Sequence, residues 1–374
     1  MAKIIILNHG LHISGVSRAL VNLANVLAAQ GHDVTIKLEI PNFTLAAELD
    51  SRVKCGLFLK EWRLLGIRIP GFLRLYQLFL EMQYRIAPKV LHRMIVGKGY
   101  DVEIAFNRGA AARIIAALDT GAKKLVWVHS DFLRCQNPLA GFASLGEAQK
   151  AYAQFDHILC LSKQSELSFR QLLGDYDSIT MSCNVLNAER IREKADSVCL
   201  EKENKTLCAV GRVCEAKNYP MLLDAVALLN ERGVDFTLWI VGDGEDMAAI
   251  TAQKEALGLD NVVLWGAQEN PYSYLAQADG YVCSSIYEGL STTTIEALIL
   301  GKACVVTDCT GMRDILGNSE YGLIVPITAE ALADGMQQIL ENEDLRRHYE
   351  AMALERAKEY EPARCIAQIE KLFS

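Results

Sequence analysis

Two glutamates, eight residues apart, bracket the segment with the clearest chemical pattern in the chain. Glu288 precedes Gly289, and Glu296 follows Ser291 and Thr292, which are good candidates for a helix N-cap. This predicts Glu288 in a loop and Glu296 in the second turn of a helix. The N–H groups at the helix start suit a pyrophosphate, and the two carboxylates suit sugar and ribose hydroxyls. A solvated glutamate pair is the alternative if the spacing is considered alone.

Two cations follow an apolar run that ends at Val210. Arg212 and Lys217 stand five residues apart in a predicted loop. Fixed cations near a diphosphate stabilise the negative charge that develops when it leaves, and this effect is larger in the transition state than in the ground state. The alternative is a pair of exposed cations with no ligand.

The first half of the chain offers two weaker candidates. His129 ends an apolar run at residues 124–129, on the side where parallel sheets bind ligands, although a lone histidine is often structural. Gly15 lies in the predicted loop after the first strand, between residues 8–10 and a helix at 18–30. There it lets the backbone approach a phosphate, as in any nucleotide-binding fold of this kind.

Short apolar runs alternate with helix-period segments along the whole chain, which indicates βαβ units and parallel sheets. The polar stretch 187–204 separates two such series. We therefore expect an N-terminal Rossmann-like domain at 1–186, joined by a C-terminal helix at about 357–374, and a second Rossmann-like domain at 187–356. A long helix from Ala329 should break near Pro362. The predicted strands are 3–7, 33–38, 102–106, 124–129 and 157–161, then 205–210, 236–241, 262–264, 280–283 and 303–307.

Composition excludes several classes of protein. The 374 residues carry a net charge of −8, which argues against a nucleic-acid partner. Eleven cysteines without a CxxC pair predict free, buried thiols in a reducing cytosol. The apolar run at the N-terminus is too short for a signal sequence, and no run is long enough to span a membrane.

Residues 57–98 differ from the rest, because eight basic and only two acidic residues interleave with apolar ones, for a net charge of +6. This pattern predicts a helix pair on a membrane surface. A helical flap with a solvated basic rim is the alternative.

The segments at 288–297, 210–218 and 241–245 together resemble glycosyltransferase family 4, retaining enzymes of GT-B fold with a Glu-x7-Glu signature. Glu288-Gly289 and Glu296-Ala297 match the signature. The loop with Gly15 resembles the family's first-domain glycine loop. This chain departs from the family at Leu290-Ser291, where an aromatic residue and Pro or Gly are usual, and the departure bears on sugar specificity.

The resemblance implies a metal-independent, retaining glycosyltransferase without a cofactor, with a donor cleft between the two domains. The donor would be a nucleotide-sugar, with UDP favoured, and the acceptor a glycan or polyprenyl-linked saccharide of bacterial surface polysaccharide synthesis. We expect a cytoplasmic protein, peripheral on the inner membrane face if 57–98 binds it. The implied catalytic residues are Glu288, His129, Arg212 and Lys217, and the implied donor-binding residues are Gly15, Arg212, Lys217, Glu288, Gly289, Ser291, Thr292 and Glu296.

Three alternatives remain open from the sequence. A UDP-sugar 2-epimerase has the same architecture and the same phosphate site. A non-catalytic partner subunit of GT-B fold would keep the architecture but lose donor-binding residues. A metal-dependent transferase of the other fold, GT-A, would use the single Asp-x-Asp at residues 175–177.

Overall fold

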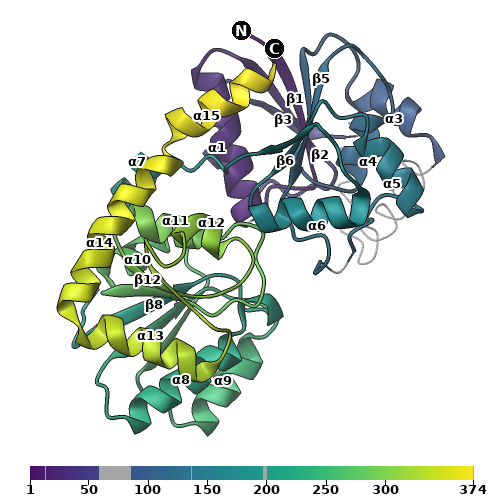
Figure 1. Ribbon diagram of the computed structural model, residues 1–374. Coiled ribbons are helices and arrows are strands. Elements are labelled where there is room, and N and C mark those ends of the chain that lie inside the picture. The colour runs from purple at the N-terminus through teal and green to yellow at the C-terminus, as the bar shows by residue number, and fades with distance from the viewer. Residues whose placement is uncertain (13, 59–85, 136, 197–199, 374) are drawn as a thin grey trace, which may run out of the picture. The chain divides into compact units, whose positions relative to one another are not determined.

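A computed structural model describes residues 1–12, 14–58, 86–135, 137–196 and 200–373. The chain forms two compact units. The first contains Met1–Leu186 and the C-terminal segment from Pro362, and the second contains Asn187–Glu361. Each unit is built on one parallel β-sheet (Figure 1).

The sheet of the first unit has strand order β3-β2-β1-β4-β5-β6-β7, and all paired strands run parallel. Chain order therefore reverses direction between β1 and β4. Strands β1, β4, β5 and β6 are almost entirely buried because helices cover both faces of the sheet. The strands are β1 (Lys3–Asn8), β2 (Asp33–Leu38), β3 (Lys54–Leu57), β4 (Val102–Ala105), β5 (Lys123–Val128), β6 (His157–Cys160) and β7 (Ile179–Met181).

Helices cover the two faces of this sheet unequally (Figure 1). Four of them share a core with the strand residues of one face, which includes Phe132, Tyr152 and Phe169. The other face carries α1, and α15 packs beside it. The helices are α1 (Gly15–Ala29), α3 (Pro88–Ile95), α4 (Ala110–Ala116), α5 (Leu145–Tyr152), α6 (Lys163–Leu173) and α15 (Pro362–Glu370).

The second unit repeats this plan with strand order β10-β9-β8-β11-β12-β13, again parallel throughout. Here the direction of chain order reverses between β8 and β11. The strands are β8 (Thr206–Val210), β9 (Thr237–Val241), β10 (Val262–Gly266), β11 (Gly280–Cys283), β12 (Ala303–Thr307) and β13 (Leu323–Val325).

Helices α8, α9 and α13 lie on one face of the second sheet, and α7, α10, α11 and α14 lie on the other (Figure 1). The helices of the unit are α7 (Ala188–Ala195), α8 (Tyr219–Glu231), α9 (Met247–Ala256), α10 (Tyr272–Gln277), α11 (Thr292–Ile299), α12 (Met312–Leu316), α13 (Ala329–Glu341) and α14 (Glu343–Ala357). The two units together have the predicted fold class, α/β with two Rossmann-like sheets.

Two helix boundaries correct the sequence predictions. Helix α1 begins at Gly15 rather than at residue 18, because the side chain of Ser14 accepts a hydrogen bond from the backbone N–H of Ser17 and caps the helix. The long helix predicted from Ala329 is two helices, since the side chain of Asn342 caps α14 by accepting from the N–H of Leu345. The break at Pro362 is present.

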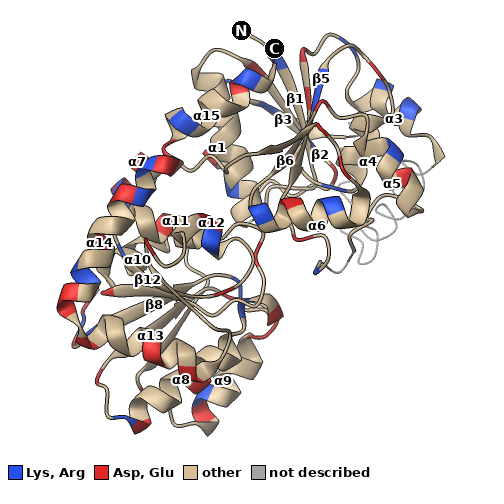
Figure 2. Cartoon of the chain, in the orientation of Figure 1, with Lys and Arg blue, Asp and Glu red and all other residues tan. Residues whose placement is uncertain are grey.

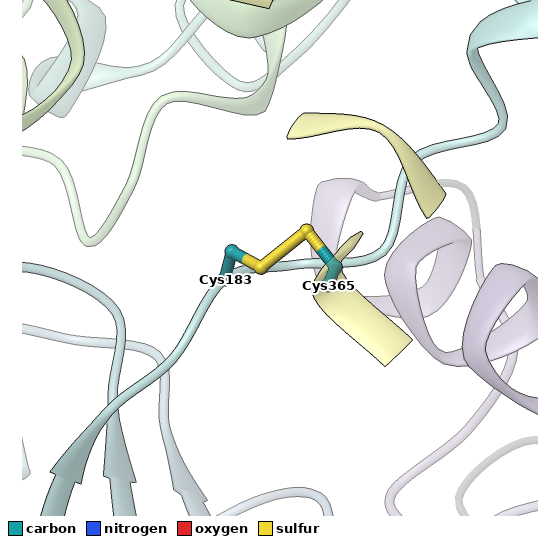
Figure 3. Close-up of a disulfide and its surroundings, with 2 residues drawn as sticks. All are labelled: Cys183 and Cys365. Atoms are coloured by element: carbon teal, nitrogen blue, oxygen red, sulfur yellow. A yellow bond between two sulfur atoms is a disulfide. The ribbon is translucent and has the colours of Figure 1, made fainter. Parts of the chain in front are cut away.

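The prediction that all cysteines are free is wrong for one pair. Cys183, just after β7, and Cys365, in α15, form a disulfide with a Cα–Cα distance of 6.1 Å (Figure 3). The two residues are 182 positions apart, and they meet only because α15 returns to the first unit. Most of the other described cysteines are buried or half-buried thiols, whereas Cys55 is exposed.

Only the two ends of the basic segment 57–98 lie within the described residues. Residues 59–85, most of the predicted helix pair, fall outside them, and the described remainder holds the end of β3 and helix α3. No helix among the described residues is both long and apolar enough to cross a bilayer. The Asp-x-Asp at 175–177 follows α6, where exposed Asp175 forms an ion pair with Arg170.

Candidate functional site

Most of the predicted site residues cluster in the second unit, where chain order reverses between β8 and β11. Open α/β sheets bind ligands at the carboxyl ends of strands at such a switch point. The loop after β8 carries Arg212 and Lys217, and the loop after β11 carries Glu288. Two hydrogen bonds join the loops: Ser284 Oγ donates to the carbonyl of Lys217 at 2.7 Å, and the N–H of Ile286 donates to the carbonyl of Ala216 at 2.8 Å.

Lys217 and Glu288 form the central ion pair of this site. Lys217 Nζ lies 2.6 Å from Glu288 Oε1, and both side chains are largely buried. Burial alone would lower the pKa of Lys217, but the neighbouring Glu288 carboxylate outweighs it, so the pKa is raised above its ordinary value. Lys217 therefore remains an ammonium group at neutral pH. The pair presents a fixed positive charge and a free carboxylate oxygen, Oε2, side by side.

Ser285 orients the carboxylate of this pair. Its hydroxyl donates to Glu288 Oε1 at 2.8 Å, and its carbonyl accepts from Thr307 Oγ1 at 2.6 Å. Ser285 is fully buried, so water does not replace its hydroxyl. The same oxygen of Glu288 thus accepts from both Lys217 and Ser285, which fixes the direction of the second oxygen.

On the expectation that this site binds a nucleotide-sugar, we expect Ser285→Ala to weaken the binding of a UDP-sugar more than the binding of UDP alone. Loss of a hydrogen bond to a charged group corresponds to roughly a tenfold to hundredfold effect. Binding of UDP and of a UDP-sugar to the variant should be compared by calorimetry. Ser285→Thr, which keeps the hydroxyl, is the control. Equal weakening of both ligands would indicate a general loss of packing and would contradict an orienting role.

Arg212 is exposed and has no ion-pair partner among the residues that the structure describes. Its loop is held by close backbone packing against the loop after β9. A Cβ at Gly242, where φ is +148°, would overlap the carbonyl oxygen of Gly211, and one at Gly244 would overlap that of Val213. Glycine is therefore required at both positions. Asp243 Oδ1 accepts a hydrogen bond from the N–H of Gly244 at 2.7 Å within this turn.

Helix α11 begins at Thr292 with Ser291 as N-cap, as predicted, but the Ser291 side chain makes no capping bond to the backbone. Its hydroxyl accepts from Thr294 Oγ1 at 3.0 Å, which leaves the first N–H groups of the helix for another acceptor. Gly289, in the loop before α11, and Thr292, the first residue of α11, are half-buried. Glu296 is buried in the second turn, where Tyr272 Oη donates to its Oε1 at 3.1 Å.

The remaining two predicted residues belong to the first unit. His129 follows β5, and its ring lies at a tilt against that of Phe106 with ring centroids 4.8 Å apart. In the described part of the chain, neither ring nitrogen has a hydrogen-bond partner. Burial lowers the pKa of His129 to about 4, with the Phe106 backbone acting in the opposite direction. The imidazole is therefore neutral at pH 7. Gly15 is the first residue of α1, so the prediction that it lies in a loop is wrong. The role expected of it, a close approach of the backbone to a phosphate, stays a prediction.

Sequence reasoning missed Ser285, Tyr272 and Gly244 as parts of the site. Ser285 stands three residues before Glu288 at the end of a strand, which is a signal that could have found it. Tyr272 carries no such signal, since it comes from α10 and meets Glu296 only in the fold. Among the described residues, no group of three or more His, Cys, Asp or Glu side chains lies in a position to hold a metal ion.

Comparison with known proteins gives the class of this site. Residues 190–356, which include all of the second-unit residues above, match the family model of glycosyl transferases group 1. The fold is similar as well: the structure of HepE from Anabaena in complex with UDP superposes with a TM-score of 0.76 at 16% identity, over 99% of this chain and 98% of that one. The chain has the GT-B fold, and its second unit is similar to the glycosyl transferases of group 1.

Individual relatives align over different lengths. An N-acetylgalactosaminyltransferase of Campylobacter jejuni, which acts on N-acetylgalactosamine-N,N'-diacetylbacillosaminyl-diphospho-undecaprenol, is 34% identical over 182 residues, or 48% of each chain. The match thus spans about half the length of that relative. An uncharacterized glycosyltransferase of Haemophilus influenzae is 24% identical over 336 residues, or 88% of each chain.

Proposed function

We propose that this protein is a retaining glycosyltransferase whose second unit binds a UDP-sugar. The observation that carries the proposal is the Lys217–Glu288 ion pair at the switch point. The two loops that form the pair also carry exposed Arg212 and lead into α11, whose first N–H groups are not capped by the Ser291 side chain. Cations and helix N–H groups suit a diphosphate, and an oriented carboxylate suits sugar hydroxyls. Buried Glu296, held by Tyr272, is assigned to the ribose hydroxyls.

In the proposed reaction, the bond between the anomeric carbon and the diphosphate oxygen breaks, and the acceptor hydroxyl oxygen bonds to that carbon on the same face. The acceptor proton passes to the departing diphosphate oxygen. Arg212, Lys217 and the start of α11 stabilise the charge that develops there, so we propose no metal ion and no protein nucleophile. Glu288 holds the sugar, and neutral His129 is the candidate in the first unit for a hydrogen bond to a sugar hydroxyl.

The acceptor we propose is a saccharide linked through diphosphate to a polyprenyl lipid, in bacterial glycoconjugate synthesis. Support comes from the acceptor named for the Campylobacter relative. A panel of UDP- and GDP-sugars, with lipid-linked and soluble acceptors and with or without EDTA, tests the donor, the acceptor and metal independence together. Acceptor-dependent UDP release that survives EDTA is expected. Nucleotide release only with GDP-sugars would overturn UDP as the donor nucleotide. Complete loss of release in EDTA would overturn metal independence.

A lipid-linked acceptor requires access to a membrane surface, and α3 offers a fitting face. Ile86, Val90 and Met94 are 74%, 50% and 64% exposed at helical spacing, and exposed Lys89 and Arg93 lie among them. Figure 2 shows basic residues on α3 and no acidic ones. Apolar side chains that enter the interface and basic ones that meet anionic headgroups are the two requirements for peripheral binding. We propose that α3 contacts the inner face of the membrane, which would make the protein cytoplasmic and peripheral.

We expect the double variant Val90→Glu, Met94→Glu to lose most of its binding to vesicles that contain phosphatidylglycerol. Each new carboxylate repels the anionic surface and removes an apolar contact. Flotation with phosphatidylglycerol and with phosphatidylcholine vesicles measures the effect. Leu167→Glu, at an exposed apolar position on α6, is the control. If both variants float like the original protein, α3 is not the contact.

A further inference from the structure

The first unit has a switch point of its own, between β1 and β4, which the proposed donor site does not use. Asn8 ends β1, and Asn107 and Arg108 follow β4 at the same edge of the sheet. The N–H of Phe106 donates to the carbonyl of Leu7 at 2.9 Å, so the two strands stay paired up to this edge. Open parallel sheets bind ligands at the carboxyl ends of strands where chain order reverses, so this edge is where we expect the first unit to bind a ligand.

Arg108 is the unusual residue at this edge. Its side chain is half-buried, Nη1 is fully buried without a hydrogen-bond partner, and no acidic side chain in the described part of the chain pairs with the guanidinium. The guanidinium lies over the ring of Phe132 at 5.9 Å from the centroid. Burial raises the pKa of Tyr152, and the charge of Arg108 acts against that rise, so the cation lies close to this aromatic cluster. A half-buried, unpaired cation is costly unless an anion meets it.

The polar groups around Arg108 are already fixed. Asn107 Nδ2 donates to Asn8 Oδ1, and Asn8 Nδ2 donates in turn to the carbonyl of Gly10 at 2.7 Å. His129, to which the proposed function gives a separate role, follows the adjacent strand β5. The edge therefore carries a cation over an aromatic ring and, from the neighbouring residues, two amides whose directions are fixed by hydrogen bonds. Among the described residues, Arg108 Nη1 remains a buried donor without a hydrogen-bond partner.

We propose that Arg108 is the anion-binding residue of an acceptor site at the β1–β4 switch point. The guanidinium binds an oxyanion of the acceptor, either a phosphate or a sugar carboxylate, and both match its planar donor geometry. This inference rests on the proposed function, because it assigns the acceptor of that reaction to the first unit and names its class, an acceptor that carries an oxyanion.

Calorimetry on the UDP-saturated protein tests Arg108 without requiring turnover. The probes are geranyl diphosphate and methyl glucuronide, with geraniol and methyl glucoside as their neutral counterparts. Arg108→Met keeps the apolar stem over Phe132 and removes the charge, and Arg108→Lys keeps a charge. Arg52→Ala removes an exposed guanidinium that already pairs with Asp50 in the same unit, so it serves as the control.

One of the two anionic probes should bind, and the one that binds identifies the oxyanion. Arg108→Met should weaken that probe by roughly tenfold to a hundredfold, with part of the affinity kept in Arg108→Lys and all of it in Arg52→Ala. UDP affinity should not change, which shows that the variants are folded. The inference is overturned if neither anionic probe binds, or if Arg108→Met binds it as the original does. Absence of UDP binding by the original protein would instead refute the proposed function, and the probe comparison can then be made without UDP.

Discussion

Glu288→Gln should lower kcat/Km for glycosyl transfer by roughly a hundredfold to a thousandfold, the usual effect of losing one oriented electrostatic contact in an active site. Glutamine has nearly the same shape but no charge, so Lys217 Nζ loses the carboxylate now 2.6 Å away. Ser285 would still donate to an oxygen at that position, but the sugar would meet an amide in place of a carboxylate.

Initial rates of UDP release at varied donor and acceptor concentrations measure this loss. Glu215→Gln provides the matched control, because Glu215 is an exposed carboxylate on the same loop as Lys217. Undiminished turnover in Glu288→Gln would remove the residue on which the site assignment depends most. A similar loss in both variants would point to a disturbed loop rather than to a role for Glu288.

Lys217→Met should raise the donor Km and lower kcat, with a combined loss of about a hundredfold or more, because a fixed charge then no longer faces the leaving diphosphate. Lys358→Met, at an exposed lysine of the same unit, should have the original rate.

The raised pKa of Lys217 also predicts a pH profile. A raised pKa keeps the ammonium form as pH rises, so kcat/Km should not decline through the ordinary lysine titration near about 10.4 on account of this residue.

Measurement of kcat/Km against pH, over the range in which the protein stays folded, checks the predicted pH profile. Circular dichroism at each pH defines that range. A decline in kcat/Km at a pH well below the ordinary lysine pKa, present in the original protein and absent from Lys217→Met, would show that Lys217 loses its proton early and would contradict the ion pair described here.

The central strands of both sheets were predictable because they are buried on both faces and read as continuous apolar runs. Strands β3, β7 and β13 were not predicted, since each lies at a sheet edge, has three or four residues and is partly exposed. Edge strands of this kind lack the apolar run that gives the signal. The start of α1 was misplaced for a local reason, the side-chain cap at Ser14.

The candidate site likewise contains residues that the sequence predicts and residues that it does not. Glu288, Lys217 and Arg212 follow central strands at fixed offsets, so the sequence alone brings them to one edge of a sheet. Tyr272 and Arg108 gain their roles from burial and from neighbours distant in sequence, which a linear pattern does not contain. The Cys183–Cys365 disulfide likewise depends on the return of α15 to the first unit.

Proton NMR of the reaction mixture from its first minutes tests whether this protein transfers a sugar with retention of the anomeric configuration. With an α-linked UDP-sugar and a lipid-linked acceptor, we expect the first new anomeric signal to belong to an α-linked product and to grow with UDP release only when acceptor is present. A β-linked first product would contradict retention. A free or nucleotide-bound epimer that forms without acceptor would show an isomerase and contradict glycosyl transfer itself.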